Sequence, residues 1–161
     1  MGKLGWTLGA VAGGLVGGAA ISALMITGER RSGEPSELIA LERAGAERIG
    51  APAPAPASAA LPDAREQAVT QGGHLVLSAI GGVAYAAAFD EDAPLVLSGL
   101  GFGAAFWALA HGLLKPVVST SAPEWSESPK IVGVHLAVHA VFGLCIAAGA
   151  RLGAVVEREF A

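Results

Sequence analysis

Four stretches of the chain are apolar over a length that predicts membrane-crossing helices, and polar segments separate them. These stretches cover about 4–26, 68–89, 95–114 and 130–151. A helix of about 20 residues is as long as the core of a bilayer is thick. The pattern therefore predicts an all-α fold, a four-helix transmembrane bundle that forms a single integral membrane domain over residues 1–161.

The last stretch, Lys130–Arg151, combines a spanning length with two polar side chains. His135 and His139 stand four residues apart, so they lie on one face of a helix, which continues through Gly143 and Ala147. A polar pair is costly in contact with lipid. This face is therefore predicted to point into protein.

The first stretch carries a ridge of glycines at four-residue spacing. The ridge consists of Gly5, Gly9, Gly13 and Gly17, with Gly14 and Gly18 beside it. Each glycine lowers helix propensity, so the ridge predicts that another backbone packs closely there; the alternative is a glycine-rich span without a dedicated partner. A cleaved signal peptide is a second alternative, with Lys3 before the apolar run and Ala20–Ser22 as cleavage site. The length of the run favours a retained helix.

The polar segment 28–65 has two parts. Ser36 is predicted to cap a short amphipathic helix, 36–50, that lies on the membrane surface or against the bundle. An Ala/Pro linker follows, and its alternating prolines favour an extended spacer. Pro62 is predicted to stand in the first turn of the next helix, and Pro116 to end the third one.

Composition supports the membrane assignment and limits the partners. Of the 161 residues, 53% are hydrophobic and 15% are charged, whereas about 25% is usual for soluble domains. The net charge of −4 without a basic block argues against nucleic acid. Membrane lipid is the expected partner, and a second copy or another membrane protein are further candidates. The single cysteine, Cys145, excludes an intrachain disulfide.

The alternating directions of four helices bring the histidines into one half of the membrane. The first and third loops then share a side, and His74, His111, His135 and His139 all stand nearer to it. Among them, His74, His111 and His139 come from three different helices and lie on stripes of small residues. We identify these three as a candidate shared polar or cofactor-binding site.

Two interpretations of this histidine cluster stay open. It can form a metal, haem, quinone or proton site, because imidazole is a common metal ligand and titrates near neutral pH. It can also consist of separate hydrogen bonds that hold helices together. No carboxylate is expected at the depth of the histidines to orient a ligand, since Glu66, Glu124 and Glu127 stand at the rim. The sequence identifies neither a cofactor nor a metal.

Three segments carry a resemblance to a family: GHLVLSAIGGVAYAAA, GFGAAFWALAHGLLKPVVSTSAPEW and HAVFG. They resemble the YagU type, an uncharacterised family of small bacterial inner-membrane proteins, over Gly73–Gly143. The residues at family motif positions are His74, His111, Pro116 and His139, whereas His135 stands outside the resemblance. The resemblance implies a multi-pass protein of the bacterial inner (cytoplasmic) membrane and no assigned activity.

Sequence motifs for common enzymatic chemistry are absent. The chain has no phosphate-binding loop after a strand, no CxxC and no GxSxG. We therefore expect a non-enzymatic accessory or interaction subunit, with a small carrier or a cofactor- or metal-binding membrane protein as the alternative. The count of Lys and Arg places the first and third loops in the cytoplasm, while the resemblance favours cytoplasmic termini, so the orientation stays open.

Overall fold

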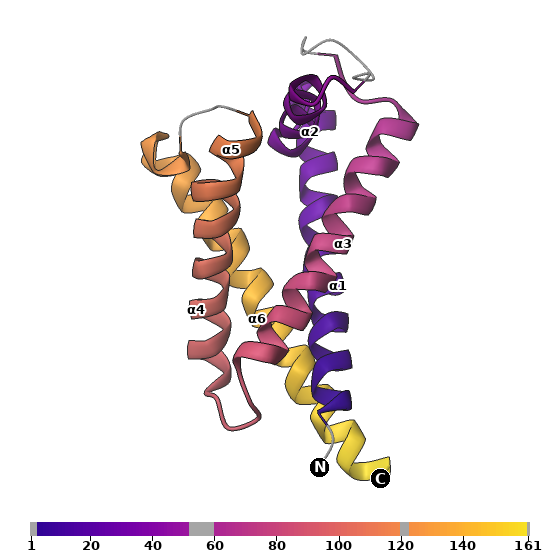
Figure 1. Cartoon of the computed structure of the whole chain (residues 1–161), viewed down its shortest axis with the longest axis vertical. Helices are drawn as coiled ribbons and strands as arrows, with labels where there is room; N and C mark the ends of the chain where they lie inside the picture. Colours follow the sequence, from indigo (N-terminus) through magenta and orange to yellow (C-terminus); the bar gives the residue numbers. More distant parts are fainter. Residues whose placement is uncertain (1–2, 52–59, 120–122, 161) are drawn as a thin grey trace.

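The computed structural model describes residues 3–51, 60–119 and 123–160, and all regular structure within these ranges is helical. This confirms the all-α prediction. The long helices alternate in direction, so the two ends of the chain lie at the same end of the molecule (Figure 1). They are α1 (Leu4–Ser32), α3 (Ala64–Ala88), α4 (Leu95–Trp107) and α6 (Pro129–Phe160). Residues 52–59 of the predicted Ala/Pro linker lie outside the described residues.

Within the described residues, three helical segments are long and apolar enough to cross a membrane. They are Leu4–Ser32, Leu95–Val118 and Pro129–Phe160. Helix α3, predicted as a further span, does not reach the same mean hydropathy. The physical reason is a set of polar side chains on its inner side: Thr70, Gln71, His74 and Ser78.

Two helix ends and one helix start differ from the prediction. The first and last helices are longer than predicted. Helix α1 continues to Ser32, and α6 continues through the charged tail to Phe160. Helix α3 begins only at Ala64, because Asp63 caps it. The Asp63 carboxylate accepts hydrogen bonds from the backbone N–H groups of Arg65 (2.9 Å) and Glu66 (2.8 Å). Pro62 therefore precedes the helix, and its predicted place in the first turn is wrong.

The prediction that Pro116 ends the third helix is also wrong. Helix α4 continues through a π-helical segment, η1 (Ala108–Leu114), into α5 (Lys115–Ser119). Proline lacks an N–H and its ring crowds the preceding turn. The wider π-helical turns accommodate it, and such segments recur at functional sites. His111 lies in this segment.

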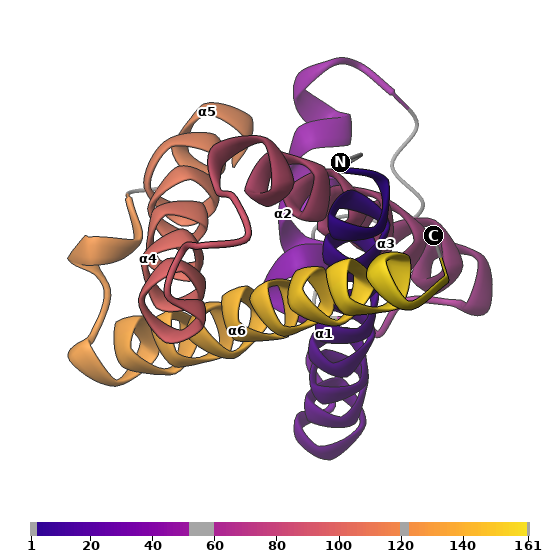
Figure 2. The ribbon, with the colours of Figure 1, turned by 90° about the horizontal axis from the view of Figure 1, so that it is seen from below.

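The glycine ridge packs against another backbone, as predicted. A Cβ on Gly9 would meet the carbonyl oxygen of Gly149, and one on Gly13 would meet that of Cys145. Helices α1 and α6 therefore cross in backbone contact (Figure 2). Gly82 of α3 approaches α1 in the same way, and Gly103 of α4 approaches the carbonyl of His139. At these crossings the helices approach closely because glycine has no side chain.

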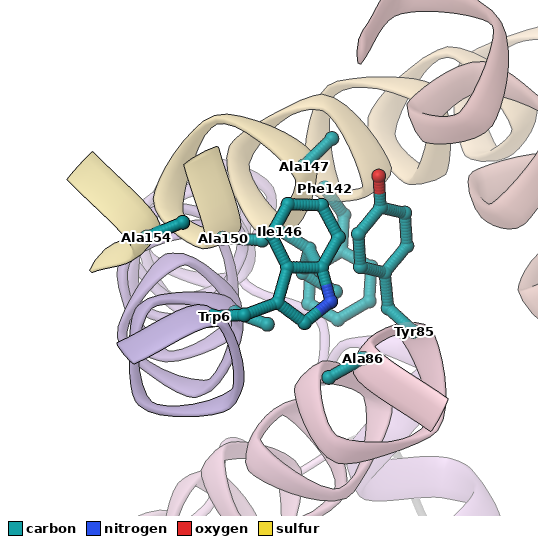
Figure 3. Packing of buried hydrophobic residues seen from close by; sticks show 9 residues of the cluster. Trp6, Tyr85, Ala86, Phe142, Ile146, Ala147, Ala150 and Ala154 are labelled. Atoms are coloured by element: carbon teal, nitrogen blue, oxygen red, sulfur yellow. The ribbon is translucent and has the colours of Figure 1, made fainter. Parts of the chain in front are cut away.

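An apolar core fills the space between α1, α3 and α6. Trp6 and Tyr85 are each 1% exposed and lie beside Phe142 and Ile146 (Figure 3). The phenol of Tyr85 would be costly to bury alone. It shares a hydrogen bond of 2.7 Å with the hydroxyl of Ser98. Ser98 of α4 thus satisfies the phenol of Tyr85.

Helix α2 (Glu37–Arg48) is the predicted amphipathic helix, and it packs against the bundle. Ile39 is fully buried, and Arg43 makes two bonds to Glu66 of α3, from Nε to Oε1 (2.6 Å) and from Nη2 to Oε2 (2.9 Å). Ser36 occupies the N-cap position, but its hydroxyl makes no capping bond. Instead, its backbone N–H donates to Oε1 of Glu29 at 3.1 Å.

Candidate functional site

A fully buried carboxylate, Glu124, lies among the histidines. It belongs to η2 (Glu124–Ser126), a short 3-10 turn in the third loop. Trp107 donates from Nε1 to Glu124 Oε1 at 3.2 Å, and His135 Nδ1 lies 2.6 Å from the same oxygen. Nδ1 of His111 contacts the other oxygen, Oε2. The expectation that Glu124 stays at the rim is wrong, because its side chain is buried and contacts both histidines.

A second carboxylate, Glu37, reaches the same histidines from the first turn of α2. Its Oε2 atom lies 3.5 Å from His135 Nδ1 and 3.9 Å from His111 Nδ1. Its Oε1 atom lies 2.5 Å from Lys115 Nζ. Four elements (α2, η1, η2 and α6) therefore contribute side chains to one cluster, which we name the His/Glu cluster: Glu37, His111, Glu124 and His135.

A backbone carbonyl orients the imidazole of His139. His135 and His139 stand one turn apart on α6, and the Nδ1–H of His139 donates to the His135 carbonyl at 2.8 Å. A carbonyl only accepts, so the neutral His139 ring keeps Nε2 without a proton. The His111 ring lies 5.0 Å from the rings of both His135 and His139. His139 thus borders the cluster on the side toward the middle of α6.

The structure brings together two of the three predicted site residues, His111 and His139. His74 has a different environment, since its Nδ1 lies 3.0 Å from the hydroxyl of Ser22 on α1. His135, which stands outside the family resemblance, is a full member of the cluster. Its four-residue spacing to His139 places both on one helix face and could have indicated this membership. The role of His74, His111 and His139 in binding a cofactor stays a prediction.

The charges around Glu124 keep it ionised. Burial raises the pKa of its carboxyl, but the hydrogen bond from Trp107 and the nearby imidazoles of His111 and His135 outweigh burial and lower the pKa below its ordinary value. The cluster thus combines two carboxyl groups with two imidazoles beside the ammonium of Lys115. When the imidazoles are neutral, their nitrogens and the carboxylate oxygens can share a bound metal ion.

The donor groups suit a divalent transition metal. One ligand atom from each member of the His/Glu cluster lies within 4.8 Å of the others. Ligand atoms around tetrahedral zinc stand about 3.4 Å apart, given bonds of about 2.0–2.1 Å. Side-chain movements of about 1 Å would close that difference. Two imidazoles with two carboxylates favour zinc, iron, manganese or cobalt over calcium or magnesium.

No protein-family model, curated protein or solved structure matches this chain. The resemblance to the YagU type therefore stays a prediction, and the His/Glu cluster is interpreted from its own geometry.

Proposed function

We propose that this chain is a four-helix protein of the bacterial inner membrane that binds a divalent transition metal ion in its His/Glu cluster. Metal binding was part of the alternative function that the sequence left open, a small carrier or a cofactor- or metal-binding membrane protein. The observation that carries it is the position of Glu124, a buried carboxylate held between the Nδ1 atoms of His111 and His135. Glu37 faces the same two atoms from α2.

The surface of α3 supports a fourth crossing of the membrane. From Ala68 to Ala88 every exposed residue of this helix is apolar, and the polar residues there are buried or half-buried. Its most exposed large side chains are Val69, Val76, Leu77, Ile80 and Val83. An apolar outer surface suits contact with lipid. Polar side chains in a membrane helix are tolerated when they face the interior of the bundle. Its modest mean hydropathy is therefore compatible with spanning.

A metal accounts for the cluster better than hydrogen bonding among side chains. One imidazolium would be enough to neutralise Glu124, yet two imidazoles lie against it. A second carboxylate, Glu37, faces the same two imidazoles. The Oε2 atom of Glu124 lies against His111 without accepting a well-aligned hydrogen bond. Buried carboxylates usually have their oxygens bonded. A metal ion coordinated by this oxygen would satisfy it.

Metal binding is tested on the detergent-purified chain carrying an affinity tag without histidines. We expect about one zinc ion per chain by elemental analysis and titration calorimetry. His135→Ala should weaken zinc binding at least tenfold, since even the loss of an outer partner of a ligand costs about 10–100-fold. His74→Ala is the matched control and should leave the affinity unchanged. Failure of the unaltered chain to bind zinc, manganese or cobalt would rule the proposal out.

Topology is tested by thiol labelling in cells whose outer membrane has been permeabilised. In a Cys145→Ala background, cysteines at Glu47 and Asp92 should lie on opposite sides of the inner membrane, because an odd number of crossings separates them. A membrane-impermeant reagent should therefore label one of them and spare the other. Labelling of both would contradict a spanning α3. Which of the two is labelled decides between the charge count and the family resemblance.

A further inference from the structure

We propose that α2 is a metal-dependent clamp, which joins α3 to the α4–α6 pair when the His/Glu cluster holds its ion. This inference rests on the proposed metal site. Glu37 is the single member of the cluster that α2 supplies, whereas His111, Glu124 and His135 belong to the chain from η1 onward. The site therefore spans two parts of the fold that meet at α2 (Figure 1).

Helix α2 is firmly anchored on one side. The paired bonds between Arg43 and Glu66 are buried, with the side chains 2% and 3% exposed, and Arg43 also donates to the carbonyl of Ala60 at 3.1 Å. Glu42 contacts the hydroxyl of Thr70, again on α3. Breaking a buried ion pair leaves an uncompensated charge, which is strongly unfavourable. We expect α2 to stay with α3 whether or not a metal is bound.

The polar contacts of α2 with α5 are less buried than the Arg43–Glu66 pair on α3. Arg48 donates to the carbonyl of Val117 in an exposed position. Gly45 faces one methyl group of Val118. The ion pair of Glu37 and Lys115 is partly exposed, with the side chains 34% and 13% exposed. Partly exposed pairs stabilise less than buried ones, so a bond from Glu37 to a metal ion held by His111 and His135 would be the strongest polar contact on this side.

The arrangement predicts how metal occupancy acts on the fold. With the ion bound, Glu37 is held against η1 and α6, and α2 closes this end of the molecule. Without it, α2 keeps its bonds to α3 and separates from α5. The position of the first loop would then report whether the site is filled.

The test measures distances between spin labels in the full-length chain, purified in detergent with Cys145→Ala. One pair joins α2 to α5, through Ala40→Cys and Val117→Cys, which replace exposed residues. The control pair joins α2 to α3, through Ala40→Cys and Arg65→Cys, also at exposed positions. Zinc should shorten and narrow the α2–α5 distribution relative to the chelator-treated sample. It should leave the α2–α3 distribution unchanged.

Glu37→Gln separates the clamp from the metal site itself. This variant should still bind zinc through the other members of the cluster, with lower affinity, but zinc should no longer move α2 relative to α5. One outcome for the chain with Glu37 in place is that zinc binds in calorimetry and yet leaves the α2–α5 distances unchanged. That result would overturn the clamp and leave the proposed function standing. Absence of zinc binding would overturn both.

Discussion

The Nδ1 atom of His135 lies 2.6 Å from Oε1 of Glu124, a carboxylate without exposed surface. The two residues come from α6 and from the short turn that precedes it, so the chain folds back to make the contact. A buried carboxylate is retained only where its charge is compensated. The contact therefore fixes both the position of the third loop and the electrostatics of the cluster.

The first prediction concerns energetic coupling between these two residues. Glu124→Gln and His135→Ala should be non-additive in the free energy of unfolding, because each removes the partner of the other. Residues in one network couple by about 0.5–3 kcal/mol. The measurement is a double-mutant cycle in one detergent with chelator present. Additive effects would mean that the bond contributes nothing specific.

A second cycle provides the contrast within the same experiment. His74→Ala and His139→Ala should add to within about 0.3–0.5 kcal/mol, as expected of residues without a shared partner. His74 pairs with Ser22, whereas His139 donates to the carbonyl of His135. Coupling between these two would instead restore the three-histidine site that the sequence predicted.

Another prediction concerns the packing of α4 on α6 through glycine. A Cβ on Gly103 would collide with the carbonyl of His139, whereas Gly101 of the same helix has open space. Gly103→Ala should lower the free energy of unfolding by about 1–3 kcal/mol through overpacking. Gly101→Ala should be neutral or slightly stabilising, because alanine favours helix. Equal melting temperatures for the two variants would contradict the backbone contact between α4 and α6.

The anchor of α2 yields a further prediction. Arg43→Met should cost about 3–5 kcal/mol of unfolding free energy, because Glu66 would remain buried without its partner. The double variant with Glu66→Met should recover most of this loss. Arg48→Met removes an exposed arginine from the same helix and should cost less than about 1 kcal/mol. An Arg43→Met protein as stable as the Arg48→Met protein would show that α2 is not anchored through this pair.

Sequence reasoning succeeded where spacing alone decides the structure. The glycines of α1 are spaced at four residues, and this spacing places them on one face in any straight helix. Their contact with the backbones of Gly149 and Cys145 follows from that face. The sequence also predicted that His111 and His139 lie close together. Their positions along two helices of opposite direction place both at a similar depth.

The remaining features depend on tertiary structure that spacing does not encode. Glu124 stands in a loop, and its burial depends on contacts with Trp107, His111 and His135, which belong to other elements. The passage of the third helix through Pro116 needs the π-helical segment around His111, which has no simple sequence signature. Glu37 lies on α2, which is packed on the bundle through Arg43 and its partner Glu66, 23 positions further along the chain.

The most direct test of the metal site is X-ray absorption at the zinc edge of the reconstituted protein. It reports the number and type of atoms bound to the metal. The account predicts two imidazole nitrogens with carboxylate oxygens in the unaltered chain, a single imidazole in His135→Ala, and an unchanged spectrum in His74→Ala. A spectrum without imidazole scattering, or one that His135→Ala leaves unchanged, would contradict it.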